Sequence, residues 1–329
     1  MPEGPTVRAG LLRALGLAAC AAVVLVGCGS ARSGSPTRAT LVLDFTPNAV
    51  HAGIYSTVAR GYDRAAGVRL DVREPSSSTD SVKLLLSGRA DFAVLDIHDL
   101  AIARAAGRDV VGVLALVQRP LAAVLAQPGI RTPRDLAGKL AGVTGLPSDD
   151  AVLRSVVAGA GGDPRRVREV TIGFDAVPAL LSRHVAGATA FWDVEGVALR
   201  RRRPGIHEFR VDDYGAPAYP ELVLCTTGRK LRTQAKLVAA TTGALARGYG
   251  VTIATPAASA ADELGRVPGL DRSLLLAELD ALRGAFTGAP GKRFGSLDRT
   301  RLAAWAAWEA RFGIVKRAPD VAAMFPSAG

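Results

Sequence analysis

The feature that most constrains the fold is a regular alternation of short apolar runs with helical patterns along the chain. The first apolar runs are of strand length and lie at 41–43, 68–72, 92–95, 110–116 and 121–126. Between them, stretches such as 81–87 and 100–106 carry apolar residues at helical spacing. This alternation predicts βαβ units, and therefore an α/β fold with mainly parallel sheets flanked by helices.

A second α/β series begins near Gln127-Pro128-Gly129, where the first pattern breaks. Its strands are expected at 139–143, 167–172, 188–191 and 206–211, and a strand at 221–226 then leads into a mostly helical tail. The roughly 290 residues involved are too many for one small core. We therefore predict two lobes with a ligand cleft between them: lobe 1 from 39–125 and 221–329, and lobe 2 from 126–220.

The N-terminus has the layout of a secretory signal. Arg8 and Arg13 precede an apolar segment, 14–26, that is too short to span a bilayer. The ending Leu25-Val26-Gly27-Cys28 resembles a bacterial lipobox, in which the Cys28 sulfur is acylated. We expect 1–27 to be a lipoprotein signal peptide and 28–40 a flexible tether, which would hold the protein on the extracytoplasmic face of the cell membrane. An uncleaved anchor or a chance apolar start is the alternative.

The charge of the chain limits its possible partners. The formal net charge is +11, and much of it comes from scattered arginine apart from the run Arg200 to Arg203. Nucleic-acid recognition favours basic residues interleaved with aromatics, or a known motif, and neither occurs here. We predict no nucleic-acid partner, and we interpret the arginine run as a solvated helix end beside anionic headgroups.

Motifs of common enzymes and metal sites are missing from the sequence. It contains no His-Glu-x-x-His, no Gly-x-Ser-x-Gly, no Gly-x-Gly-x-x-Gly after a strand and no Cys-x-x-Cys. The four histidines are widely spaced, and Cys225 is a lone cysteine in an apolar run once the signal and Cys28 are set aside. We therefore predict no catalytic residue, metal, cofactor or disulfide.

A polar, aromatic-bearing loop follows the first strand. Asp44 to Asn48 comes after the run 41–43, and a helical pattern starts at His51, so these side chains should lie at the carboxyl edge of a sheet, where open α/β folds bind ligands. Phe45 could stack on a flat ring, and Asn48 could read its donor–acceptor edge. His51 near a helix N-terminus would tend to be neutral. The alternative is that Asp44, Asn48 and His51 are only turn and cap residues.

This opening resembles a known family signature. The run Leu-Asp-Phe-Thr-Pro-Asn-x-x-His-x-Gly-Ile-Tyr at 43–55 is similar to the start of bacterial solute-binding proteins for thiamine pyrimidine precursors. Later segments agree in the same order, at 87–93, 117–120, 130–139, 191–195 and 213–219. The resemblance covers nearly all of the mature chain. It implies a type II periplasmic-binding-protein fold, a hydroxymethylpyrimidine or formylaminopyrimidine ligand, and delivery to the permease and ATPase subunits of an ABC importer.

Trp192 and Glu195 follow the apolar run 188–191 and should open the next helix beside the cleft. An aminopyrimidine presents an exocyclic NH2 beside a basic ring nitrogen, and one carboxylate can accept from both when the ring is protonated. We expect Glu195 to take this role, with Trp192 as a stacking wall. The family often has Trp-Asn-x-Glu here, whereas this chain has Asp193 in place of the Asn. The alternative is a first-turn Glu that favours the helix dipole and a half-buried Trp.

The loop Thr144 to Asp150 meets a helix N-terminus, which is a natural anion site. It lacks the spacing of a phosphate-binding loop, and Asp149 and Asp150 already place negative charge there, so a phosphorylated ligand is disfavoured. Ser148 in this loop, Asp96 after the strand 92–95, and Tyr219 complete the predicted ligand-binding set.

These observations favour a monomeric, lipid-anchored receptor without enzymatic activity. One alternative keeps the receptor but changes the ligand to riboflavin or an alkanesulfonate, although a sulfonate would need cationic or donor-rich surroundings. The other is an enzyme, because eukaryotic pyrimidine synthases share the fold and a similar opening. Their Cys-Cys-Cys-Phe-Cys segment is reduced here to Cys225, within 211–226.

Overall fold

The computed structural model describes residues 35–77, 79–287 and 293–326. Residues from Ser35 onward form one compact unit. The predicted signal peptide, the predicted acylation site Cys28 and most of the predicted tether lie outside the described residues. Within the described residues, no helix has the length and apolar character needed to cross a bilayer.

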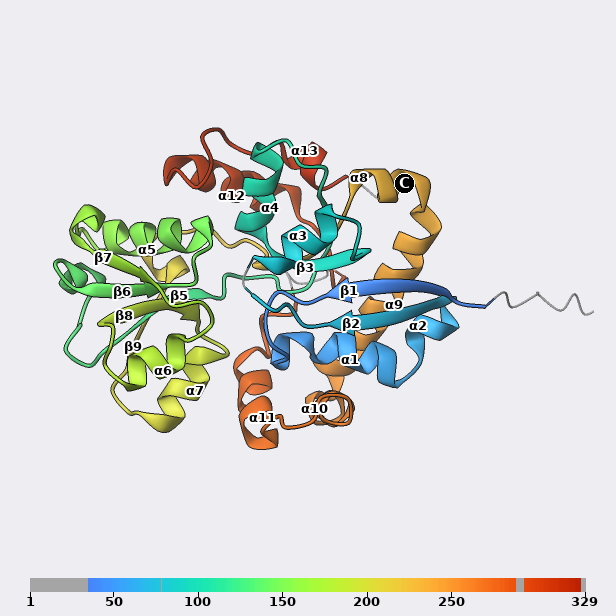
Figure 1. The fold of residues 1–329 in the computed structure, drawn as a ribbon, viewed down its shortest axis with the longest axis horizontal. Coiled ribbons are helices and arrows are strands. Elements are labelled where there is room, and N and C mark those ends of the chain that lie inside the picture. The colour runs from blue at the N-terminus through green and yellow to red at the C-terminus, as the bar shows by residue number, and fades with distance from the viewer. Residues whose placement is uncertain (1–34, 78, 288–292, 327–329) are drawn as a thin grey trace, which may run out of the picture. The chain divides into compact units, whose positions relative to one another are not determined.

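The first sheet has the strand order β2-β1-β3-β10-β4 (Figure 1). Its strands are β1 (Thr37–Val42), β2 (Val68–Arg73), β3 (Phe92–Asp96), β4 (Val111–Ala115) and β10 (Leu222–Thr226). Strand β1 pairs in parallel with β2 and β3, and β10 pairs antiparallel with both β3 and β4. Four strands therefore share one direction, and β10 runs against them.

The second sheet repeats this plan with the order β7-β6-β8-β5-β9. Its strands are β5 (Ala122–Ala126), β6 (Leu140–Val143), β7 (Arg168–Thr171), β8 (Gly187–Phe191) and β9 (His207–Arg210). Here β5 is the reversed strand, between β8 and β9. The reversed strand of each sheet is the one that the chain enters directly from the other sheet. The sheets are thus mixed, and the predicted parallel character holds for four of five strands in each.

Two predicted boundaries change. Strand β5 pairs only in the second sheet, so the chain passes between sheets over 116–121, before the predicted break at 125/126. The apolar run 121–126 could form a strand of either sheet, because the sequence does not reveal which strands it pairs with. Strand β1 begins at Thr37, so 37–40 is strand rather than tether. That the two halves behave as separate lobes stays a prediction.

Helices cover both sheets. Helix α5 packs on one face of the second sheet, and α6 and α7 lie on the other (Figure 1). The bounds are α1 (Ala52–Ala59), α2 (Tyr62–Ala65), α3 (Asp80–Leu86), α4 (Ile97–Ala105), α5 (Pro147–Gly159), α6 (Ala176–Leu181), α7 (Glu195–Arg202), α8 (Gly228–Thr233), α9 (Ala235–Ala254), α10 (Pro256–Leu264), α11 (Arg272–Ala281), α12 (Arg299–Arg311) and α13 (Val321–Met324), with 3-10 turns η1 (Ala49–His51), η2 (Pro133–Leu136), η3 (Pro164–Arg166) and η4 (Val211–Tyr214).

Close packing of α1 against α9 fixes the start of the chain relative to the C-terminal helices. A Cβ at Gly53 would lie 2.4 Å from the Tyr249 ring, and one at Gly248 would lie 2.1 Å from the Gly53 carbonyl oxygen. The Tyr249 hydroxyl donates to the Val50 carbonyl at 2.8 Å. The helix pair therefore holds η1, and with it the loop that follows β1.

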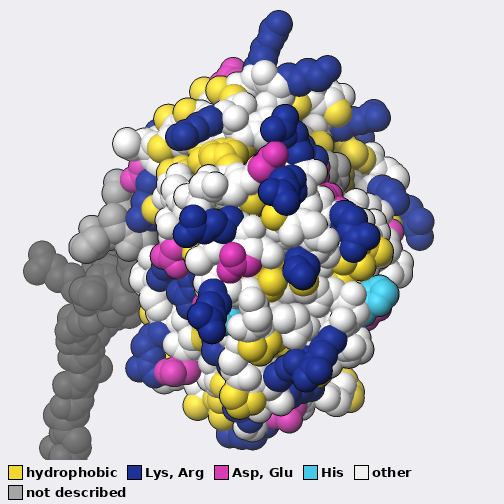
Figure 2. Space-filling model, turned by 90° about the vertical axis from the view of Figure 1, so that its left-hand side faces the viewer, with side chains coloured by type: hydrophobic (Ala, Val, Ile, Leu, Met, Phe, Trp, Pro, Cys, Tyr) yellow, Lys and Arg dark blue, Asp and Glu magenta, His cyan; other side chains and the backbone are white. Residues whose placement is uncertain are grey.

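Basic side chains are spread over the end of the molecule that carries the second sheet. Figure 2 shows Lys and Arg scattered across this face, with hydrophobic and uncharged groups between them. The arginine run at the end of α7 is partly engaged, because Arg200 pairs with Glu208 and Arg201 donates to Ser273. Arg200, Arg201 and Arg202 are nevertheless exposed, as expected of a solvated helix end.

Candidate functional site

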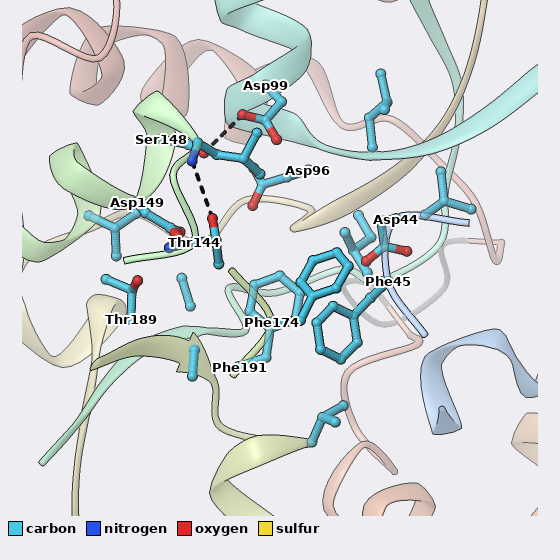
Figure 3. Close-up of a pocket in the computed structure, with 18 of the residues that line it drawn as sticks. Asp44, Phe45, Asp96, Asp99, Thr144, Ser148, Asp149, Phe174, Thr189 and Phe191 are labelled. Carbon is cyan, nitrogen blue, oxygen red and sulfur yellow. Dashed lines mark hydrogen bonds between the residues drawn. The ribbon is translucent and has the colours of Figure 1, made fainter. Parts of the chain in front are cut away.

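A pocket opens where strands of both sheets end (Figure 3). Its lining comes from the last residues of β3 and β8, the loops after β1, β6 and β7, the first turns of α3, α4, α5 and α7, and the first residues of β5 and β10. Carboxyl ends of strands are where α/β folds bind small ligands. The pocket therefore lies at the position that the sequence predicted for a cleft.

Three phenylalanines form the aromatic part of the lining: Phe45, Phe174 and Phe191. Phe45 follows β1 in the first sheet, and Phe174 follows β7 in the second. Their rings meet edge to face, with centroids 4.4 Å apart and planes at 73°. Such faces suit a flat ring. Phe45 was predicted, whereas Phe174 was not, although its place after a strand and Gly173 was a usable signal.

Acidic side chains supply all the charge of the lining. They are Asp44, Asp96, Asp99, Asp149 and Glu195, and no Lys, Arg or His occurs among the lining residues that the structure describes. Five carboxyl groups in one small space repel each other unless they hold protons or a cation. The pocket is therefore built for a ligand that donates hydrogen bonds or carries positive charge.

Two of these carboxyls secure the start of α5. The Asp149 carboxylate accepts from the Thr144 N–H at 2.7 Å, and the Ser148 hydroxyl donates to Asp99 at 2.9 Å. Burial raises the pKa of Asp149, and it raises the pKa of Asp99 to about 7. The chain's own acidic groups thus already lie beside the helix N-terminus.

Glu195 begins α7 and lines the pocket, as predicted. It accepts a hydrogen bond from the Phe191 N–H at 3.2 Å. Burial raises the pKa of Glu195 to about 7, against the lowering effect of that backbone bond. At neutral pH this carboxyl can therefore hold or release a proton when a ligand arrives.

The Asn48–His51 pair lies at the same edge but works mainly as a cap. The Asn48 side chain accepts from the Val50 N–H at 2.9 Å and donates to the Thr46 carbonyl, also at 2.9 Å. His51 is fully buried, and its Nε2 lies 2.9 Å from Asp44. Asn48 lines the pocket, but His51 does not. The capping alternative therefore describes His51.

Trp192 and Tyr219 lie outside the lining. The Trp192 N–H donates to the Pro120 carbonyl at 3.0 Å, and its ring lies under the guanidinium of Arg210 at 4.1 Å. The Tyr219 hydroxyl lies 3.0 Å from Nε2 of His98. Neither ring faces the ligand space, so the stacking wall predicted at Trp192 is replaced by Phe45, Phe174 and Phe191. Asp96 and Ser148 do line the pocket.

The match to a family model decides the family. The model described as NMT1/THI5 like matches residues 48–259, which is more than half of the chain and contains most of the pocket lining. This chain belongs to the NMT1/THI5-like family.

Relatives within the NMT1/THI5-like family carry two kinds of name. The chain is 32% identical to the formylaminopyrimidine-binding protein of Halalkalibacterium halodurans over 66% of this chain and 66% of that protein. It is 25% identical to the 4-amino-5-hydroxymethyl-2-methylpyrimidine phosphate synthase of Legionella pneumophila over 51% of this chain and 54% of that one. The matches thus span just under two thirds of the first relative and about half of the second.

Solved structures support the two-sheet fold. The periplasmic aliphatic sulphonate binding protein SsuA of Escherichia coli superposes with a TM-score of 0.69 at 15% identity, covering 89% of this chain and 93% of that one. At this identity the likeness concerns the fold alone. The NMT1/THI5-like chain therefore has the α/β periplasmic-binding-protein architecture that we expected.

Proposed function

We propose that the protein is the substrate-binding component of an ABC importer and captures an unphosphorylated thiamine pyrimidine precursor between its two sheets. The observation that carries this proposal is the acidic, phenylalanine-lined pocket without a basic side chain among its described lining residues. The relative from Halalkalibacterium halodurans is named a formylaminopyrimidine-binding protein, which supports the choice of ligand. Delivery to a permease and ATPase, and attachment to the outer face of the membrane through Cys28, belong to the same proposal.

The chemistry of an aminopyrimidine fits Glu195 and the phenylalanines. A protonated ring nitrogen and the neighbouring NH2 offer two donors in one plane, which a carboxylate accepts as a charge-assisted pair. Phe45 and Phe174 come from opposite sheets and can close on the two faces of the ring. In this proposal the protein closes around the pyrimidine ring, and no covalent bond is made or broken.

An anionic ligand fits the pocket poorly. A sulfonate or phosphate would meet five carboxyl groups, and Asp149 already accepts the Thr144 N–H in the loop before α5. This argues against the alkanesulfonate alternative and against a phosphorylated pyrimidine.

The synthase alternative has less support than the receptor. Synthases occur among the relatives. The cysteine-rich segment that the resemblance implies for such enzymes has Cys225 alone over 211–226, where it is buried in β10 and burial raises its thiol pKa well above the usual range. We therefore propose binding without catalysis.

Calorimetric titration of the purified protein tests the proposal. The ligands are 4-amino-5-hydroxymethyl-2-methylpyrimidine and its formylaminopyrimidine relative, with riboflavin and taurine as controls. We expect micromolar or tighter pyrimidine binding that Glu195→Gln weakens at least tenfold, while Trp192→Phe, outside the lining, binds like the wild type. A heat of binding with riboflavin or taurine, and none with either pyrimidine, would rule out the proposed ligand.

A further inference from the structure

Beneath the pocket, side chains that are far apart in the sequence meet at the junction of the two sheets. Asp96 ends β3, His98 lies in α4, and Glu221 directly precedes β10. One ligand-type atom from each of these three residues lies within 4.8 Å of the other two. His98 and Glu221 are fully buried, whereas Asp96 also lines the pocket. The cluster is therefore reachable from the ligand space through Asp96.

One oxygen of Glu221 has no partner in the described part of the chain. Its Oε2 accepts from the Leu121 and Ala122 N–H groups, which fixes the carboxylate against the passage between the sheets. Its Oε1 is buried without a hydrogen bond and lies 3.8 Å from Nε2 of His98. Two donors bound to a tetrahedral metal at about 2.1 Å lie roughly 3.4 Å apart, so this pair is already near a chelating separation.

The surroundings of His98 match the second shell of a metal ligand. Its Nδ1 contacts the buried carboxylate of Glu309, and its ring is packed among Tyr219, Trp305 and Trp308. An Nδ1–H held by a carboxylate leaves Nε2 as an acceptor; the Tyr219 hydroxyl lies 3.0 Å from it, and a metal at this position would replace that contact.

The acidic groups of the cluster outnumber its basic ones. Three carboxyl groups, those of Asp96, Glu221 and Glu309, surround one imidazole, and no lysine or arginine of the described residues forms an ion pair with any of them. Buried carboxylates need a balancing charge or a proton. A divalent cation would balance two of the three.

We propose that Asp96, His98 and Glu221 form a binding site for a first-row divalent transition metal at the junction of the two sheets. One imidazole nitrogen and two carboxylate oxygens are ligands that suit zinc, manganese, cobalt or iron(II). Because ligating groups must be deprotonated, binding releases protons from the cluster. The metal would tie the end of β3, the start of α4 and the entry to β10 together.

The test is cobalt(II) and zinc(II) titration of the purified, chelator-treated protein. We expect one metal per chain at micromolar or lower dissociation constant, visible d–d absorption with cobalt, and heats that depend on the buffer because protons are released. Proton NMR of the cobalt form should contain a hyperfine-shifted exchangeable resonance from the His98 Nδ1–H.

Variants assign the site. Asp96→Asn and His98→Gln should each lower the affinity at least 30-fold, whereas His184→Gln, at an exposed histidine, should bind cobalt like the wild type. Absence of stoichiometric binding to the wild-type protein overturns the proposal, and so does binding without the shifted resonance. Loss of binding in His184→Gln would reveal an adventitious surface site and overturn it equally.

Discussion

At the scale of single residues, the side chains that set the character of the pocket are Glu195 and Asp99, since burial raises the pKa of each to about 7. Glu195 ionises near 4.5 in an unfolded chain. A raised folded pKa stabilises the fold below the unfolded value, and this contribution is lost as the pH rises from about 4.5 to 7. The ligand-free protein should therefore become less stable over that interval, and Glu195→Gln should flatten part of the slope in denaturant titrations at successive pH values.

Ligand affinity should follow the same carboxyl. The bound state in our proposal shares one proton between Glu195 and the pyrimidine ring, and above pH 7 the free protein no longer supplies it. We expect the dissociation constant to rise toward tenfold per pH unit above 7. Calorimetry from pH 6 to 9 measures this rise. Asp99→Asn should keep the slope, whereas a slope that survives in Glu195→Gln would contradict the role of Glu195.

At the scale of elements, the start of α5 decides how the pocket treats anions. The Asp149 carboxylate takes the Thr144 N–H that a phosphate oxygen would otherwise accept. Asp149→Asn removes one negative charge but keeps an oxygen acceptor. We expect the phosphorylated hydroxymethylpyrimidine to gain affinity relative to the unphosphorylated one, by roughly tenfold in competition titrations. Asp150→Asn is the matched control, because Asp150 pairs with Arg154 and does not line the pocket, so an equal gain there would contradict the assignment.

The α1–α9 contact offers a second test at this scale. Gly53→Ala places a methyl group 2.4 Å from the Tyr249 ring, and such overpacking costs about 1–3 kcal/mol of unfolding free energy. Gly243 lies in α9, the helix that carries Tyr249, and a Cβ at Gly243 meets no atom within 4 Å. Gly243→Ala should therefore leave the unfolding free energy unchanged or raise it by up to about 1 kcal/mol. Urea denaturation measures both changes. Equal effects of the two variants would contradict close packing at Gly53.

At the scale of the whole molecule, a ligand between the sheets should stabilise the fold by mass action. A ligand at about 100 times its dissociation constant adds about 2.7 kcal/mol to the free energy of unfolding. For a compact unit of this size that corresponds to roughly 4 °C in melting temperature. A calorimetric scan at that ratio checks it, and an unchanged melting temperature despite measured binding would mean that the unfolded chain binds equally well.

The sequence predicted the architecture well because apolar runs and helical spacing are local. The expected strands at 68–72 and 92–95 match β2 and β3 within one residue. The apolar run 121–126 could not be assigned to a sheet, since pairing is not local. In the same way, Trp192 and Phe174 both follow strands, and only packing against Arg210 or Phe45 decides which ring faces the pocket. The cluster of Asp96, His98 and Glu221 joins residues more than 120 positions apart, which spacing alone does not reveal.

The placement of β10 also has a consequence for the order of events in time. A chain is made from its N-terminus onward. The second sheet has all its strands by Arg210, whereas β4 joins the first sheet only through β10, which ends at Thr226. The second sheet can therefore be completed first, while β3 and β4 of the first sheet still lack their shared partner β10. A fragment that stops before Leu222 would have one finished sheet and one open one, and the open one is where the chain is most exposed to aggregation.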